Sequence, residues 1–305
     1  MTSADFCLAW NWEYDSDFIR LLERECREAG LSFLQIHPHN LEDTLRSLEQ
    51  RHLTFRAFLD RASDTDPRFL PLVQWAIDHA ICRINDPQTT HWTLDKASLH
   101  LALINVGLNS PYTIILPSIE EQPVLDVLDL SPLGPCFVIK PAHGGGGQGV
   151  VIEASTVEEV VKARQEFPSD RYLLQYYIQP ANLNGNPAYF RILFCAGSTH
   201  PCWWNTKTHE YRPVALEETT KHHLESLSPI TESIARLTGL DLFSTEIALT
   251  TDHRFIVVDY ANDPVDLRSQ STCRDGVPDS IVNDIAEKLV RTVVSRLGNP
   301  PGDHP

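Results

Sequence analysis

The sequence of 305 residues has little positive charge and no long apolar segment. Its 25 lysine and arginine residues face 41 aspartate and glutamate residues, which gives a net charge of −16. Such an acidic chain is a poor ligand for nucleic acid or anionic membranes, because both are negatively charged themselves. No run of about 18 apolar residues is present to span a bilayer, and the opening MTSADFCLAW lacks the features of a signal peptide. We therefore expect neither nucleic acid nor membrane as a partner.

Paired cysteine motifs are also absent. The chain has seven cysteines, an odd number without any C-x-x-C pair: Cys7, Cys26, Cys82, Cys136, Cys195, Cys202 and Cys273. Most of them lie in apolar stretches, so we expect reduced, buried thiols and a cytoplasmic location. The chain is longer than a usual single core, which predicts lobes around a shared cleft. Whether it forms a homo-oligomer is left open.

Apolar periodicity predicts a mixed α/β and α+β protein. Near the N-terminus, strands and helices alternate, which predicts a small parallel sheet built from segments 5–12, 16–29, 31–37 and 40–50. The segment LDRASDTDPRFLPLVQWAIDHA predicts a polar loop followed by a helix. From residue 136 onward, the pattern changes to hairpins, with one helix predicted from Thr156, where Glu159 completes a capping box, and another from residue 222 to about 238. We therefore predict an N-terminal α/β domain, a small lobe and a large lobe, at residues 1–110, 111–185 and 186–305.

A glycine-rich segment, KPAHGGGGQGVV at residues 140–151, raises the question of a ligand. No Lys-Ser or Lys-Thr follows its last glycine, which excludes a P-loop, and the strand-like VVIEA that follows excludes the dinucleotide-binding fingerprint. A protein kinase flap has similar spacing, but no H-R-D or D-F-G follows. What remains is a hairpin tip whose N–H groups can point at phosphate oxygens, or a flexible surface turn. The glycines concerned are Gly144, Gly145, Gly146, Gly147 and Gly149.

A second hairpin, FSTEIALTTDHRFIVVDYAN, carries facing acids. A turn near Asp252 and His253 places Glu246 opposite Asp259 on one face. Facing like charges repel unless a cation lies between them, and hard oxygen ligands suit Mg²⁺ that also binds phosphate. Asn262 could supply a third oxygen. The alternative is an exposed edge where both acids point at water, and the glycine-rich segment favours the metal site.

Five motifs occur in the order seen in the ATP-grasp enzymes, and the chain resembles that family from about residue 90 to 268. They are Lys96 in DKASLHLALI, Lys140 before the glycines, the strand LLQYYI, Arg191 in YFRILF and the acidic hairpin 246–262. The resemblance implies an ATP-grasp fold with a preceding parallel-sheet domain and with ATP between two lobes. It assigns ATP contacts to Lys96, Lys140, the glycines, and the segment Gln175, Tyr176, Tyr177 and Ile178. It assigns Mg²⁺, with Mn²⁺ as the alternative ion, to Glu246, Asp259 and Asn262.

The sequence departs from the family pattern at two places. The usual metal motif is Glu-x-Asn, whereas this chain has Asp259-Tyr-Ala-Asn262. Either a bulge brings Asn262 into place or Asp263 substitutes for it. Tyr189 stands where the ribosomal-modification ligases have aspartate, so the substrate class does not transfer.

The resemblance implies an ATP-dependent, ADP-forming carboxylate–amine ligase. A carboxylate attacks the γ-phosphate, and an amine or similar nucleophile then displaces phosphate from the acyl phosphate. Arg191 is the candidate for stabilising the transferred phosphoryl group, with an ordinary strand ion pair as its alternative, and Arg268 is the candidate for holding a substrate carboxylate. The expected substrate is a small-molecule or peptide carboxylate. A small-molecule kinase of the inositol type and a non-catalytic nucleotide-binding protein remain alternatives.

Overall fold

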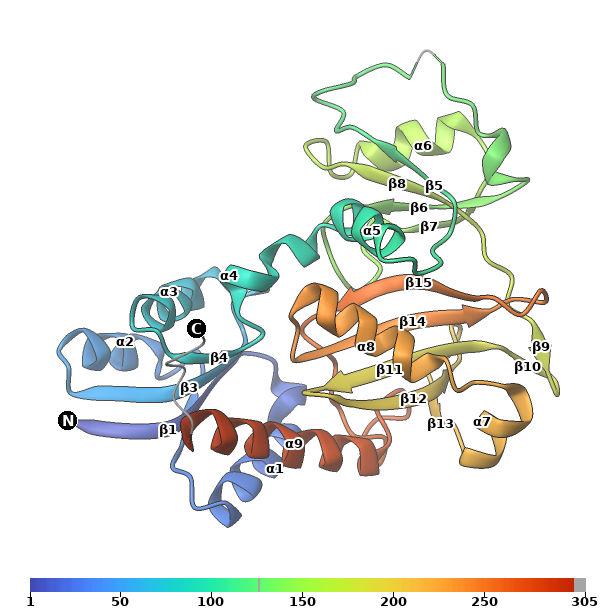
Figure 1. Ribbon diagram of the computed structural model, residues 1–305. Helices are drawn as coiled ribbons and strands as arrows, with labels where there is room; N and C mark the ends of the chain where they lie inside the picture. The colour runs from blue at the N-terminus through green and yellow to red at the C-terminus, as the bar shows by residue number, and fades with distance from the viewer. Residues whose placement is uncertain (126, 299–305) are drawn as a thin grey trace.

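The computed structural model describes residues 1–125 and 127–298. Its strands form one parallel sheet near the N-terminus and antiparallel sheets in the rest of the chain, as Figure 1 shows. The predicted mixture of α/β and α+β structure is therefore confirmed. Within the described residues, no helix is long and apolar enough to cross a membrane.

The parallel sheet has the strand order β2-β1-β3-β4. Its strands are β1 (Thr2–Trp10), β2 (Phe33–Ile36), β3 (Leu53–Arg61) and β4 (Cys82–Ile84), and its helices are α1 (Ser16–Glu28), α2 (Leu41–Glu49) and α3 (Leu70–Asp78). The predicted parallel start is confirmed, but β3 is missing from the sequence prediction, which assigns its last residues to a polar loop. Arg56, Asp60 and Arg61 interrupt the alternation of apolar and polar residues by which this strand could have been predicted. One of them, Arg61, is buried because its guanidinium bonds the Asp15 carboxylate at 2.7 Å.

The small sheet is antiparallel, with the strand order β5-β8-β6-β7. Its strands are β5 (Thr113–Leu116), β6 (Phe137–Pro141), β7 (Val151–Ala154) and β8 (Tyr172–Tyr176). Helix α6 (Val157–Arg164) begins at the predicted capping box, in which Glu159 N donates to Thr156 Oγ1 at 3.3 Å and Thr156 N donates to Glu159 Oε2 at 3.1 Å. Local sequence signals such as this capping box are sufficient to predict these elements.

The large sheet is antiparallel, with the strand order β13-β12-β11-β14-β15. Its strands are β11 (Tyr189–Cys195), β12 (Ser198–Trp204), β13 (Tyr211–Pro213), β14 (Leu242–Leu249) and β15 (Phe255–Asn262), and a short hairpin of β9 (Asn182–Leu183) and β10 (Asn186–Pro187) precedes them. The helix predicted from residue 222 to about 238 ends where expected but begins at residue 227, because another helix precedes it. Helix α7 (Leu216–His222) ends at His223, whose φ of +55° is incompatible with a continuing helix, and α8 (Leu227–Thr238) follows.

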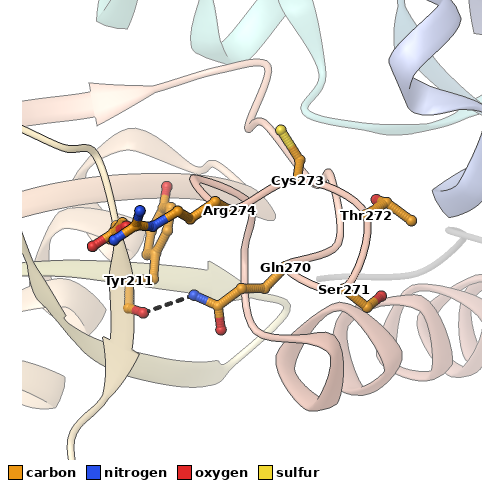
Figure 2. Close-up of a pocket in the computed structure, with 7 residues that line it drawn as sticks. Tyr211, Gln270, Ser271, Thr272, Cys273 and Arg274 are labelled. Carbon is orange, nitrogen blue, oxygen red and sulfur yellow. Dashed lines mark hydrogen bonds and ion pairs between the residues drawn. The ribbon is translucent and has the colours of Figure 1, made fainter.

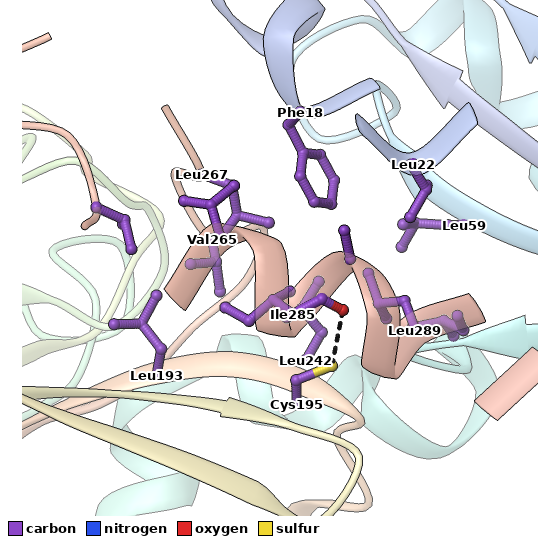
Figure 3. Packing of buried hydrophobic residues seen from close by; sticks show 14 of the residues in the cluster. Phe18, Leu22, Leu59, Leu193, Cys195, Leu242, Val265, Leu267, Ile285 and Leu289 are labelled. Carbon is purple, nitrogen blue, oxygen red and sulfur yellow. Dashed lines mark hydrogen bonds between the residues drawn. The ribbon is translucent and has the colours of Figure 1, made fainter. Parts of the chain in front are cut away.

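Helix α9 (Asp279–Gly298) joins the parallel sheet to the large sheet (Figure 1). Its buried side chains, among them Ile285 and Leu289, share one core with Phe18 and Leu22 of α1 and with Leu193 of β11 (Figure 3). The opposite face of the large sheet packs against α8 and α5 (Lys96–Asn105), and α4 (Pro87–Thr90) precedes α5 in the chain. One face of the large sheet packs against α9. The predicted acids Glu246 and Asp259 lie on the same face, on the strands nearer to the small sheet.

Candidate active site

Glu246 of β14 and Asp259 of β15 are direct partners across the two strands, as predicted. Symmetry of the hairpin about its turn is not what produces this pairing. Closer to the turn, Ile247 pairs with Val257, so Val258 is an extra residue that shifts the register. This β-bulge brings Asp259, rather than its neighbour, opposite Glu246.

A second register shift lies between Glu246 and Ser244 and places Asn262 opposite Ser244. Asn262 Nδ2 donates to Asp259 Oδ2 at 2.9 Å, so the amide lies beside the acid pair. Asp263 points elsewhere: its carboxyl lies near Asn85 and Arg61, and burial raises its pKa to about 7. Of the two possibilities for the third oxygen, the geometry favours Asn262.

Two lysines from other elements approach the acid pair. Lys140 Nζ, at the end of β6, donates to the Val258 carbonyl oxygen at 2.9 Å. Lys96, the first residue of α5, donates from Nζ to the Gly144 carbonyl oxygen. Burial alone would raise the pKa of Asp259, but the positive charges of Lys140, Lys96 and Arg191 and the hydrogen bond from Asn262 together lower that pKa. The structure thus brings together side chains that are far apart in the sequence.

Arg191 of β11 lies on the other side of Glu246. The two residues are partners between β11 and β14, and Arg191 Nη1 is 3.6 Å from Glu246 Oε1. Tyr189 donates its hydroxyl to Glu246 Oε2 at 3.1 Å. Burial raises the pKa of Glu246, and Asp259 adds to this effect while Arg191 opposes it. A loose ion pair of this kind leaves guanidinium donors of Arg191 available to a further anion.

The aromatic rings of β12 and β13 support this arginine. The Arg191 guanidinium carbon lies 4.9 Å from the Trp204 ring centre and 5.9 Å from the Tyr211 ring centre. Arg191 Nε also donates to Ser244 Oγ at 3.2 Å. These contacts hold the guanidinium in one position, which suits a group that must meet a transferred phosphoryl group.

The glycine loop, residues 142–150, connects β6 to β7, so the predicted strand–glycine–strand arrangement is confirmed. Gly144, Gly146 and Gly147 have positive φ values, and a Cβ atom at any of them or at Gly145 would meet nothing within 4 Å. Gly149 is different, because a Cβ atom there would lie 2.7 Å from the Phe167 ring. The exposed tip of the loop therefore has room for a ligand, whereas Gly149 packs against the small lobe.

The predicted adenine-binding segment begins in β8. Gln175 is buried, and its Nε2 donates to the Tyr260 hydroxyl at 2.6 Å, so this side chain is used within the protein. Tyr176 is 44% exposed, and Ile178 packs against Val258 of β15. The strand ends at Tyr176, two residues earlier than predicted. The backbone from Tyr176 through Tyr177 to Ile178 is left as the part that can meet a ligand.

Arg268 is held by carboxylates of the protein itself. Its Nη2 donates to Asp266 Oδ2 at 2.7 Å and to Asp275 Oδ2 at 3.0 Å, and Nη1 lies 2.9 Å from Cys273 Sγ. A substrate carboxylate would have to replace one of these partners. The acids are absent from the sequence prediction, although Asp266 lies only two residues before Arg268.

A pocket of about 460 Å³ lies against Tyr211, whose ring centre is 5.9 Å from the Arg191 guanidinium carbon, and Figure 2 shows its lining. It is lined by Glu210, Tyr211, Gln270, Ser271, Thr272, Cys273 and Arg274. Gln270 Nε2 donates to the Tyr211 carbonyl oxygen at 3.0 Å, and Arg274 pairs with Glu210. Tyr211 connects the pocket to Arg191. This pocket is absent from the sequence prediction, because it is built from an irregular loop that carries no periodic signal.

The metal-binding prediction concerns Glu246, Asp259 and Asn262. Within the described residues, no group of three or more His, Cys, Asp or Glu side chains is placed to hold an ion. The candidate set therefore has two carboxylates and one amide. Oxygen donors of this kind fit Mg²⁺, which usually takes few protein ligands and completes its shell with water and phosphate oxygens.

No model of a known protein family matches the chain, and no curated protein sequence does. Solved structures do match. A RimK-domain ATP-grasp protein from Sphaerobacter thermophilus is 19% identical, with a TM-score of 0.65 over 94% of this chain and 99% of that chain. The D-alanine–D-alanine ligase of Bacillus anthracis, solved with ATP, is 12% identical, with a TM-score of 0.66 over 98% and 100% of the two chains. The macrocyclase MdnC of Microcystis aeruginosa, bound with its precursor peptide MdnA, is 12% identical, with a TM-score of 0.63 over 94% and 99%. The chain has the ATP-grasp fold over nearly its whole length.

Proposed function

We propose that the protein is an ATP- and Mg²⁺-dependent ligase that forms ADP while it activates a substrate carboxylate as an acyl phosphate. One observation carries this proposal: Lys96, Lys140 and Arg191 converge on the facing acids Glu246 and Asp259 between the small and large sheets. Such a cluster suits phosphoryl transfer, in which catalysis is mainly positioning and charge neutralisation.

The nucleotide would lie between the two sheets. Lys96 and Lys140 would contact its phosphates, and the N–H groups of the open glycines would approach the same oxygens. The backbone of Tyr176, Tyr177 and Ile178 would bond the adenine edge. The ATP-bound ligase of Bacillus anthracis, which shares the fold, supports this placement.

Glu246, Asp259 and Asn262 would hold Mg²⁺ by their oxygens. When bound, the ion neutralises charge on the phosphate oxygens. Its presence would also favour the ionised form of Glu246, whose pKa is raised by burial and by Asp259. Arg191 would donate to the transferred phosphoryl group from the other side of Glu246. The half-buried position of the acid pair, with the Glu246 side chain 16% exposed, disfavours the alternative of an exposed, solvated edge.

We propose the pocket beside Tyr211 as the entrance for the acceptor. The loop from Gln270 to Arg274 exposes amide, hydroxyl and charged groups to it, which suits a polar molecule (Figure 2). One protein of this fold is named for joining D-alanine, and another was solved with a precursor peptide. A small-molecule or peptide carboxylate is thus the proposed substrate class.

The chemistry is tested by trapping the acyl phosphate. A pool of amino acids, small acids and peptides is screened for ADP release with ATP and Mg²⁺, and hydroxylamine is then added to the active mixture. We expect a hydroxamate of the acceptor, with ADP and free phosphate in equal amounts. Asp259→Asn serves as the control and should form no hydroxamate. Phosphate that stays covalently bound to the acceptor would instead indicate a kinase and overturn the ligase proposal.

A further inference from the structure

A polar junction, buried at its centre, connects four elements behind the acid pair. The Tyr260 hydroxyl on β15 accepts a hydrogen bond from Gln175 Nε2 on β8 at 2.6 Å and lies 2.7 Å from His100 Nδ1 on α5. Gln175 Nε2 also donates to Thr113 Oγ1 on β5 at 3.0 Å. One hydroxyl therefore links the edge strand of the large sheet to the small sheet and to α5.

All three partners of this junction are out of contact with solvent. Tyr260 and Gln175 are each 2% exposed and His100 is 3% exposed. Burial lowers the pKa of His100 to about 4, so its ring is neutral at pH 7. Because Gln175 donates to the hydroxyl oxygen, the hydroxyl proton is free to be donated to Nδ1 of a neutral ring. Loss of any one partner would leave a buried polar group without its bond.

The junction lies next to the candidate site along both strands. Tyr260 directly follows Asp259, and the alternation of a strand directs its side chain into the core shared with α5 and α8. On the small sheet, Lys140 pairs with Leu173, two residues before Gln175 on β8. Lys140 in turn bonds the carbonyl of Val258, two residues before Tyr260. The small sheet therefore bonds β15 at two neighbouring places, by Lys140 and by Gln175.

We propose that Tyr260 is a positioning residue for the nucleotide site: its hydroxyl, bonded to Gln175 and His100, fixes β15 against the small sheet and so sets the position of Lys140 relative to Asp259. The inference rests on the proposed function, because that function gives Lys140 and Asp259 their joint task. Tyr260 itself faces away from the site and contacts no reacting group.

Tyr260→Phe removes the hydroxyl and keeps the ring. Tyr172→Phe is a matched control, since Tyr172 lies on the same β8, is fully buried, and donates its hydroxyl to the Ala163 carbonyl oxygen at 2.7 Å within the small lobe. We expect Tyr260→Phe to weaken binding of a non-hydrolysable ATP analogue with Mg²⁺ about fivefold or more, and Tyr172→Phe less than about twofold. Calorimetry measures both affinities.

A double-mutant cycle separates positioning from general structural support. In the Lys140→Ala background, Tyr260→Phe should change affinity for the analogue less than about twofold, because the lysine that it positions is gone. An equal loss in both backgrounds would overturn the proposal, and so would an unchanged affinity of Tyr260→Phe itself.

A second measurement needs no nucleotide. Val257 N donates to the Asn109 carbonyl oxygen at 2.9 Å along the edge of β15. If the junction fixes this strand, Tyr260→Phe should speed hydrogen exchange of the Val257 amide about tenfold, and Tyr172→Phe should leave it unchanged. Unchanged exchange in Tyr260→Phe would overturn the proposed positioning role. A wild-type protein that binds no nucleotide would instead overturn the proposed function.

Discussion

At the residue scale, the candidate site has the opposite charge balance from the whole protein. The chain carries a net charge of −16. The site, however, combines the cations of Lys96, Lys140 and Arg191 with the two carboxylates Glu246 and Asp259, and burial disfavours ionisation of one of these acids. Attraction of a polyanion is therefore local and depends on a few side chains.

Lys140 is the residue on which this attraction can be tested. Lys140→Ala removes a cation that lowers the pKa of Asp259 and that we propose as a phosphate contact. We expect the affinity for an ATP analogue to fall by about 1.5–3 kcal/mol, or more than about tenfold. Lys162→Ala, on the exposed face of α6 in the same lobe, should leave the affinity unchanged. Equal calorimetric affinities of wild type and Lys140→Ala would contradict the assignment.

At the element scale, the glycine loop has two parts with different requirements. Gly144 to Gly147 form an open tip, whereas Gly149 has a φ of +69° and no room for a Cβ atom beside Phe167. The first part is available for a ligand and the second determines how the loop returns to β7. Sequence spacing alone assigns the same role to all these glycines.

Gly149→Ala should therefore destabilise the protein, and Gly145→Ala should not. Alanine in a left-handed conformation costs about 1–2 kcal/mol, and the contact with Phe167 adds to this. Gly145 has no positive φ and open space around it, so alanine there should be neutral or slightly stabilising. Urea unfolding of both variants measures the difference. Equal free energies of unfolding would contradict both the conformational cost at Gly149 and the contact with Phe167.

Helix α7 depends on one carboxylate at its start. Glu218 accepts hydrogen bonds from Arg212 Nη2 at 2.8 Å, from Ala215 N at 3.0 Å and from Trp203 Nε1 at 3.1 Å. The bond from Arg212, together with those from Ala215 and Trp203, lowers the pKa of Glu218 from 4.5 to about 2 against the opposing effect of burial. The ionised side chain therefore connects α7 to β12 and β13.

A lowered pKa gives this contact a defined pH dependence. Its contribution to folding stability is present above a pH of about 4.5 and is lost as the pH falls toward about 2, because the unfolded state then binds the proton more tightly. Glu218→Gln should thus lower the Tm at pH 7, and the difference from wild type should shrink as the pH approaches 3. The exposed neighbour Glu217, changed to Gln, should show no such trend. A constant Tm difference across this range would argue against the assigned charge.

At the scale of the whole molecule, α9 makes the N-terminal and C-terminal parts of the chain one folded unit. Its buried face contacts the core of the parallel sheet and that of the large sheet (Figure 3). The residue ranges assigned to the three domains stay a prediction, as do the cytoplasmic location and the oligomeric state. The shared core nevertheless implies that damage to α9 affects both ends of the chain.

Leu289→Ala tests this shared core. Leu289 is fully buried, so the truncation should lower the free energy of unfolding by about 2–5 kcal/mol. Val294→Ala on the same helix is a matched control, because Val294 is 44% exposed and should cost less than about 0.5 kcal/mol. Urea titrations followed by circular dichroism give both values. A similar loss in the two variants would contradict the assignment of Leu289 to the shared core, because alanine is the better helix former at both positions.

Much of the fold can be predicted from the sequence, because the signals involved are local. The capping box of α6 and the glycine hairpin each depend on residues close together in the chain, whereas the facing of Glu246 and Asp259, although predicted, also requires the bulge at Val258. Strand β3 escapes prediction because the ion pair that buries Arg61 comes from Asp15, far away in the sequence. The pocket of Figure 2 was not predicted either, because the irregular loop that lines it has no apolar periodicity.

The sequence by itself determined the class of fold, the order of its motifs and the residue types of the candidate site, since periodicity, capping and turn chemistry act over a few residues. Only the tertiary structure decided how these residues meet. The bond from Lys140 of β6 to the Val258 carbonyl oxygen at the bulge and the junction of Tyr260 with Gln175 and His100 depend on contacts between separate elements. The last of these spans 85 and 160 residues of chain, a separation at which packing of the whole molecule, and no local preference, selects the partner.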